Sequence, residues 1–282
     1  MAWNSTMSPG RRSQVMATEV PSSNFSTRCD MSSCHRCSFP VMGTFASISI
    51  AVSVDRQRAR VAIQRCRDSL EADERRFSHF DPGSEISRSL RREVIAAEAQ
   101  QEIDQVMRAC RSLEEESGGV FRATDPRTGR IDTAGYVKGY AIRKAAEAIR
   151  NEGVHDFLLS VGGDTTCSGA PNQRRPWRVA VADPLRPRAI AALLEVHDGA
   201  VATAGVTQRG EHIWRSGDHG SSEHLSWTVT GPDIALADAF STIGFAMGPK
   251  GISWVNGHEG YASLVVMRDG SLTGDSMLLR AS

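Results

Sequence analysis

The chain has 282 residues, and its 33 Lys and Arg residues balance 33 Asp and Glu residues, so its formal charge at pH 7 is zero. A balanced charge argues against binding to nucleic acid, which attracts basic surfaces. Apolar residues make up 40% and charged residues 23%, as is typical of globular proteins. No apolar run approaches the roughly 18 residues of a membrane span. These values exclude integral membrane, collagen-like and wholly disordered proteins, and they predict one large domain or two small ones.

The first 38 residues are rich in Ser, Thr, Asn and Pro and show no periodicity. We interpret residues 1–38 as a disordered tail and residues 39–282 as the folded domain. No apolar segment of about 7–15 residues follows Arg11 and Arg12, so no secretory signal is recognised and a cytoplasmic location is expected. The tail holds Cys29, Cys34 and Cys37, whose spacing would suit either a zinc site or, as we favour, exposed thiols in a reducing compartment.

Hydrophobic periodicity predicts strands and helices in irregular alternation after residue 39. Alternation of apolar and small polar residues predicts a strand at 45–52, and apolar residues three and four apart predict helices at 55–77 and 100–116. A turn is expected at 80–84. Further helices are expected from about 132 to 150 and from 234 to 247, where Asp233 is the expected N-cap. The remaining predicted strands are 157–161, 177–182, 191–196, 200–204, 225–230 and 262–267.

Strands and helices are interleaved irregularly, and several of these strands follow one another late in the chain. This order favours an α+β fold over a doubly wound parallel sheet. The sequence contains no Gly-x-Gly-x-x-Gly motif, no Walker loop and no Gly-x-Ser-x-Gly motif, so nucleotide binding or hydrolysis by those routes is not expected.

Two local groups of residues could carry chemistry. Asp238 and Thr242 lie four residues apart on a predicted helix and therefore share a face, and their oxygens are ligands that suit Mg²⁺ better than zinc. Lys138 stands near Gly135 at the start of another predicted helix, where glycine and the helix dipole favour a phosphate. Taken alone, each group is also compatible with an ordinary surface helix or a glycine-rich turn.

Six motifs, in this order, resemble the ApbE-type FAD:protein FMN transferases. The resemblance covers about Phe39 to the C-terminus. The matching segments are Val41-Met42-Gly43-Thr44, Phe77-Ser-His-Phe-Asp-Pro-Gly-Ser-Glu-Ile-Ser87, Asp132-Thr-Ala-Gly135-Tyr-Val-Lys138-Gly139-Tyr140-Ala141, Gly162-Gly163-Asp164, Ala202-Thr203-Ala204-Gly205 and Ala237-Asp238-Ala239-Phe240-Ser241-Thr242.

The resemblance implies a single α+β domain of mixed or antiparallel sheets flanked by helices, similar to the T-fold. It implies an Mg²⁺-dependent enzyme that moves the FMN part of FAD to a Ser or Thr hydroxyl of an acceptor protein carrying a short flavinylation motif, with release of AMP. The implied FAD-binding residues are Met42, Phe80, Asp132, Lys138, His212 and Ile213. The implied metal ligands are the Gly135 carbonyl, the Asp238 carboxylate and oxygens of Ser241 and Thr242.

The acceptor hydroxyl needs a base, and the sequence leaves Asp132 and His212 as alternatives. Two positions depart from the family pattern. Phe121 is followed by Arg122 instead of Asp, and His212-Ile213 lacks the Asp-Pro that follows it in the family. The second departure keeps open an FAD-binding relative with impaired catalysis, and a further alternative is an FAD pyrophosphatase that yields FMN and AMP, with water in place of the acceptor hydroxyl.

Overall fold

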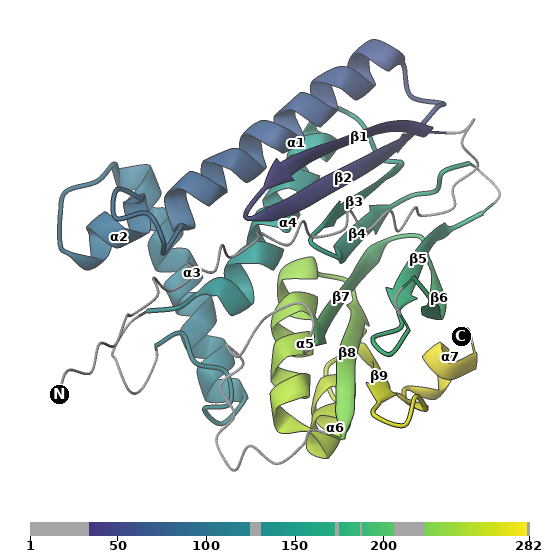
Figure 1. Ribbon diagram of the computed structural model, residues 1–282. Coiled ribbons are helices and arrows are strands. Elements are labelled where there is room, and N and C mark those ends of the chain that lie inside the picture. The colour runs from purple at the N-terminus through teal and green to yellow at the C-terminus, as the bar shows by residue number, and fades with distance from the viewer. Residues whose placement is uncertain (1–33, 125–130, 173–174, 187, 206–222, 281–282) are drawn as a thin grey trace, which may run out of the picture.

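The computed structural model describes residues 34–124, 131–172, 175–186, 188–205 and 223–280. Helices and strands alternate along these residues, with two strands at the start and several more after the fourth helix (Figure 1). The elements are β1 Cys34–Val41, β2 Thr44–Ala51, α1 Arg56–Phe77, α2 Glu85–Leu90, α3 Ala97–Glu116, α4 Ala134–Asn151, β3 Phe157–Val161, β4 Asp164–Ser168, β5 Trp177–Ala182, β6 Ile190–Val196, β7 Gly199–Gly205, β8 His224–Gly231, α5 Ile234–Met247, α6 Pro249–Asn256, β9 Ala262–Met267, β10 Leu272–Gly274 and α7 Ser276–Arg280.

One antiparallel sheet organises the described part of the chain. Its eight strands lie in the order β1-β2-β3-β4-β7-β8-β9-β10. The strands β5 and β6 form a separate hairpin. The eight strands fall into two halves of equal topology, because in each half a hairpin is followed by helices and then by a second hairpin. The helices α1–α4 belong to the first half and α5–α6 to the second, and the halves meet where β4 pairs with β7.

The sheet buries both faces along its centre. Side chains of β3, such as Phe157 and Leu159, pack into the main core beneath α1, α4 and α5, whereas Leu158 between them packs into a smaller core under the β5–β6 hairpin. Figure 1 shows these three helices on one side of the strands and β5–β6 on the other. Strands covered on both faces lose the simple alternation of apolar and polar residues, which explains the nearly continuous apolar run of β3.

Capping residues set the helix boundaries. The Asp55 carboxylate accepts hydrogen bonds from the backbone N–H groups of Gln57 and Arg58 and starts α1. Asp233 caps α5 in the same way, and Gly248, with φ of 63°, ends it. The predicted helix at 234–247 is therefore confirmed with its boundaries. The predicted strand at 262–267 is also present with its predicted boundaries.

The prediction that residues 34–38 belong to a disordered tail is wrong. These residues begin β1, whose register with β2 runs from Cys34 opposite Ala51 to Val41 opposite Thr44. Residues 1–33, including Cys29, lie outside the described residues. The helices α2, α6 and α7 and the strands β4 and β10 were not predicted, and α3 begins three residues earlier than expected.

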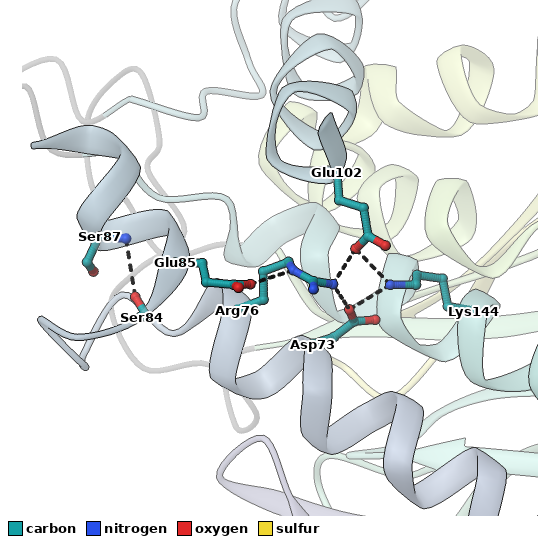
Figure 2. A network of polar contacts seen from close by, with 7 residues as sticks. All are labelled: Asp73, Arg76, Ser84, Glu85, Ser87, Glu102 and Lys144. Atoms are coloured by element: carbon teal, nitrogen blue, oxygen red, sulfur yellow. Dashed lines mark hydrogen bonds and ion pairs between the residues drawn. The ribbon is translucent and has the colours of Figure 1, made fainter. Parts of the chain in front are cut away.

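A network of charged side chains joins the first four helices (Figure 2). Lys144 of α4 donates to Asp73 of α1 and to Glu102 of α3, at 2.8 Å in each case. Arg76 of α1 pairs with Glu102 at 2.6 Å and with Glu85 of α2 at 2.7 Å. Asp73 is fully buried, and this burial raises the pKa of its carboxyl group although Lys144 opposes the shift. The network therefore fixes α1, α2 and α3 against α4.

Candidate functional site at the junction of the two halves

Three charged side chains meet where the two halves of the sheet join. The Lys138 ammonium of α4 contacts the carboxylate of Asp164 at the start of β4. It also lies 3.6 Å from Oδ1 of Asp238 on α5. Both carboxylate side chains are no more than 1% exposed, whereas the Lys138 side chain is 20% exposed. The first half of the fold contributes Lys138 and Asp164, and the second half contributes Asp238.

The backbone holds these carboxylates from both sides. Asp238 Oδ2 accepts a hydrogen bond from the Gly139 N–H at 3.0 Å. Asp164 Oδ1 accepts one from the Thr203 N–H of β7 at 3.1 Å. Each carboxylate therefore has a backbone amide as a hydrogen-bond partner, which offsets part of the cost of burying it. The cluster is thus anchored on α4, α5 and both central strands.

Gly139 allows α4 and α5 to approach closely. A Cβ atom at this position would lie 2.7 Å from the Ala235 Cα and 2.7 Å from the Ile234 carbonyl oxygen. Both are backbone atoms of α5 and cannot move aside alone. The glycine next to Lys138 therefore places the two helices at the distance at which its N–H reaches Asp238.

A two-residue turn places Asp164. Gly162 and Gly163 have φ angles of 58° and 98° and connect β3 to β4. Positive φ at both central residues is the geometry that hairpins of this length favour. The sharp turn predicted at Gly162-Gly163 is present, and it starts β4 with a carboxylate that the sheet buries.

The predicted metal ligands lie on α4 and α5. Asp238 is buried, and Thr242 follows one helical turn later and is half-buried. The Ser241 hydroxyl donates to the Asp238 carbonyl oxygen at 2.8 Å, so this hydroxyl is directed at its own helix. Gly135 lies in the first turn of α4, one turn before Gly139. The described residues contain no group of three or more His, Cys, Asp or Glu side chains arranged to hold a metal ion.

This donor set nevertheless fits magnesium. Mg²⁺ is commonly held by one or two protein carboxylates and completes its coordination with water and substrate phosphates. A buried carboxylate, a hydroxyl and a main-chain carbonyl are all hard oxygen donors. Asp238 with Thr242 and Gly135 therefore provides the ligand types that such an ion takes, without the histidines or cysteines that zinc prefers.

Two of the predicted FAD-binding residues of the first half, Met42 and Phe80, lie outside its helices and strands. Met42 occupies the turn between β1 and β2 with φ of 53°, and its N–H donates to Glu74 Oε1 at 2.8 Å. Phe80 follows the end of α1 and is 97% exposed. A phenyl ring with so little protein contact is available to pack against a ligand.

Asp132 lies immediately before α4, where its Oδ1 accepts a hydrogen bond from the Ala134 N–H at 2.9 Å. This bond ties the carboxylate to the first turn of the helix that carries Gly135 and Lys138. His212 and Ile213 lie outside the described residues, so Asp132 and His212 both remain predicted bases.

The sequence did not single out two polar residues that support this site. Asp164 was assigned only to a turn, although its motif was recognised. His79 forms a 2.9 Å hydrogen bond through Nε2 with the Thr133 hydroxyl and therefore connects the segment containing Phe80 to the start of α4. A histidine next to an aromatic residue in a predicted turn was the available signal, but its partner lies 54 residues away.

Comparison with known proteins agrees with this architecture. The model of the ApbE family matches residues 123–265, about half of the chain and the part that contains all three charged residues of the junction. The chain belongs to the ApbE family. It is 26% identical over 166 residues to an FAD:protein FMN transferase of Klebsiella pneumoniae, and 28% identical over 151 residues to one of Salmonella typhimurium. These alignments cover 55% and 50% of this chain, and 47% and 43% of the relatives, so the chain spans about half the length of the curated relatives it matches.

Solved structures share the fold. The flavin transferase ApbE from Vibrio cholerae has a TM-score of 0.69 at 17% identity, and the ApbE protein from Thermotoga maritima has 0.71 at 18%. Each comparison covers 88% of this chain and 99% of the other. The predicted α+β fold of the ApbE type is therefore confirmed. None of the helices in the described residues is long and apolar enough to span a membrane.

Proposed function

We propose that this protein is an FAD:protein FMN transferase, which moves FMN from FAD to a Ser or Thr hydroxyl of an acceptor protein and requires Mg²⁺. The observation that carries the proposal is the junction itself, where Lys138, Asp164 and Asp238 meet between α4 and α5. Its support is family membership together with relatives that are named for this activity.

The reaction replaces the phosphoanhydride bond of FAD by a phosphoester bond to the acceptor. The acceptor oxygen attacks the phosphorus on the FMN side of the diphosphate, the bond from that phosphorus to the AMP oxygen breaks, and AMP leaves. Phosphoryl transfer depends mainly on positioning and on neutralising charge. A magnesium ion held by Asp238, Thr242 and the Gly135 carbonyl would supply positive charge at the diphosphate.

The residues of the chain would supply the remaining functions. Asp132 or His212 would accept the proton of the acceptor hydroxyl. Phe80 would pack against the flavin, and Met42 would border it. Lys138 was predicted to meet the diphosphate, but its ammonium is already paired with Asp164 and lies near Asp238. Because of this pairing, we expect the Lys138 charge to act mainly on the two carboxylates and less on the diphosphate.

The direct test measures AMP and protein-bound flavin. The protein is incubated with FAD, Mg²⁺ and a candidate acceptor, and in-gel flavin fluorescence and AMP release are recorded. Asp238→Asn should abolish both signals, whereas Asp68→Asn, at an exposed position on α1, should leave them unchanged. Absence of both signals in the wild type, with an acceptor that a relative modifies, would reject the proposal.

The same assay separates the alternatives. Tight FAD binding by calorimetry without AMP release would identify a binding protein with impaired catalysis. Free FMN and AMP in the absence of an acceptor would identify a pyrophosphatase. Phe80→Ala should weaken FAD binding several-fold without lowering the melting temperature, because an exposed ring contributes little to the folded state.

A further inference from the structure

Asp164 has no role in the reaction proposed above, although it is the most buried charged group of the junction. It belongs to the Gly162-Gly163-Asp164 motif, its side chain is fully buried, and it contacts the Lys138 ammonium directly. Its other oxygen, Oδ1, accepts the Thr203 N–H. A buried carboxylate is costly to desolvate and is retained where a partner offsets that cost. The contact with Lys138 is such a partner.

Lys138 lies between two carboxylates, of which Asp238 is a predicted metal ligand and Asp164 is not. Its ammonium is in direct contact with Asp164 but 3.6 Å from Asp238 Oδ1. An ammonium and a divalent cation compete for the same carboxylate, because each is attracted to its negative charge. If Lys138 paired fully with Asp238, it would occupy a position that a metal ion needs.

We infer that Asp164 is a positioning residue that holds the Lys138 ammonium against β4 and so keeps Asp238 available to a divalent cation. The inference rests on the proposed function only in taking Asp238 as a metal ligand. Asp164 also adds a negative charge near the ion. Both effects have the same direction, since loss of the Asp164 charge would free Lys138 to pair with Asp238 and would make the surroundings less attractive to a cation.

The test is a titration of the full-length protein with Mn²⁺ in the absence of FAD, followed by electron paramagnetic resonance of the free ion. Asp164→Asn should weaken Mn²⁺ binding at least tenfold. Lys138→Gln should strengthen it, because the competing ammonium is gone. The double variant Lys138→Gln/Asp164→Asn should recover the wild-type affinity to within about threefold, since the cluster then loses one positive and one negative charge.

A matched control is available at Asp73, which is also fully buried and paired with a lysine of α4. Asp73→Asn should leave Mn²⁺ affinity unchanged. A double variant that binds as weakly as Asp164→Asn would overturn the inference, because loss of the Thr203 hydrogen bond would then explain the defect. Failure of the wild type to bind Mn²⁺ at millimolar concentration would also overturn it.

If Asp164→Asn does not fold, as a thermal melt would show, Lys138→Gln decides alone, and weaker Mn²⁺ binding in that variant refutes the inference. AMP release and flavin fluorescence are measured separately on the wild type. Their absence together with the expected order of Mn²⁺ affinities would reject the proposed function and leave the role of Asp164 standing. Normal turnover with affinities out of order would do the reverse.

Discussion

Removing the positive charge of Lys144 should destabilise the protein far more than removing the negative charge of its partner Asp73. Lys144→Met leaves the fully buried Asp73 carboxylate with Arg76, 3.5 Å away, as its remaining cationic partner in the network. Breaking a buried ion pair from one side costs about 3–5 kcal/mol, because the other charge stays buried with less compensation, here only the more distant Arg76. At about 2–4 °C per kcal/mol for a domain of this size, the melting temperature should fall by about 6–20 °C.

Asp73→Asn removes the charge whose burial is unfavourable. The amide oxygen can still accept from Lys144, and Lys144 keeps Glu102. We therefore expect a loss of about 1 kcal/mol or less. Calorimetry at pH 7 measures both changes. Arg65→Met serves as the control, because the Arg65 side chain is 63% exposed and its pair with Glu152 should contribute less than about 1 kcal/mol. A Lys144→Met variant no less stable than Asp73→Asn would refute the reasoning.

Three further predictions concern the Asp73 carboxyl group, the helix contact at Gly139 and two buried thiols. Because the pKa of Asp73 is raised above 3.8, the native state holds this proton more tightly than the unfolded state, so the stability of wild type relative to Asp73→Asn should rise as pH falls from neutral toward 3.8, measured by urea unfolding. Gly139→Ala should destabilise by about 1–3 kcal/mol in the same assay, because its Cβ would overlap Ala235, and an unchanged stability would contradict the close helix contact. Burial raises the pKa of the Cys66 and Cys110 thiols to about 12, so Ellman's reagent should modify these two only after unfolding, and modification of Cys66 or Cys110 in the native protein, located by mass spectrometry, would disprove their burial.

The sequence predicted those elements whose boundaries depend on residues close to them in the chain. The helix α5 was found because Asp233 caps it and its apolar residues recur at helical spacing. The helix α6 was missed because it begins at Pro249, immediately after the glycine that ends α5, and is only eight residues long. The strand β1 was not predicted, because its residues from Cys34 to Ser38 show no apolar alternation. Pairing with β2, rather than local preference, makes this segment a strand.

The candidate site was predictable only to the same extent. Asp238 and Thr242 are related by helical spacing, and Lys138 stands near glycines, so local sequence made them candidates, and the family resemblance was needed to select them. The importance of Asp164 depends on β4 pairing with β7 and on α4 crossing beside it, and no local pattern encodes either arrangement. Its motif pointed to a turn, whereas its burial and its ionic partner became apparent only in three dimensions.

The equal topology of the two halves has a consequence for how the protein matures on the ribosome. Gly139 and Asp238 are 99 residues apart, so the first half emerges with Lys138 and Asp164 long before α5 can dock. Until then, the surface of α4 that receives α5 stays uncovered. The proposed cation site, which draws on Gly135 of the first half and Asp238 of the second, would therefore form only after the two halves have joined, and a bound cation would stabilise only the fully assembled fold.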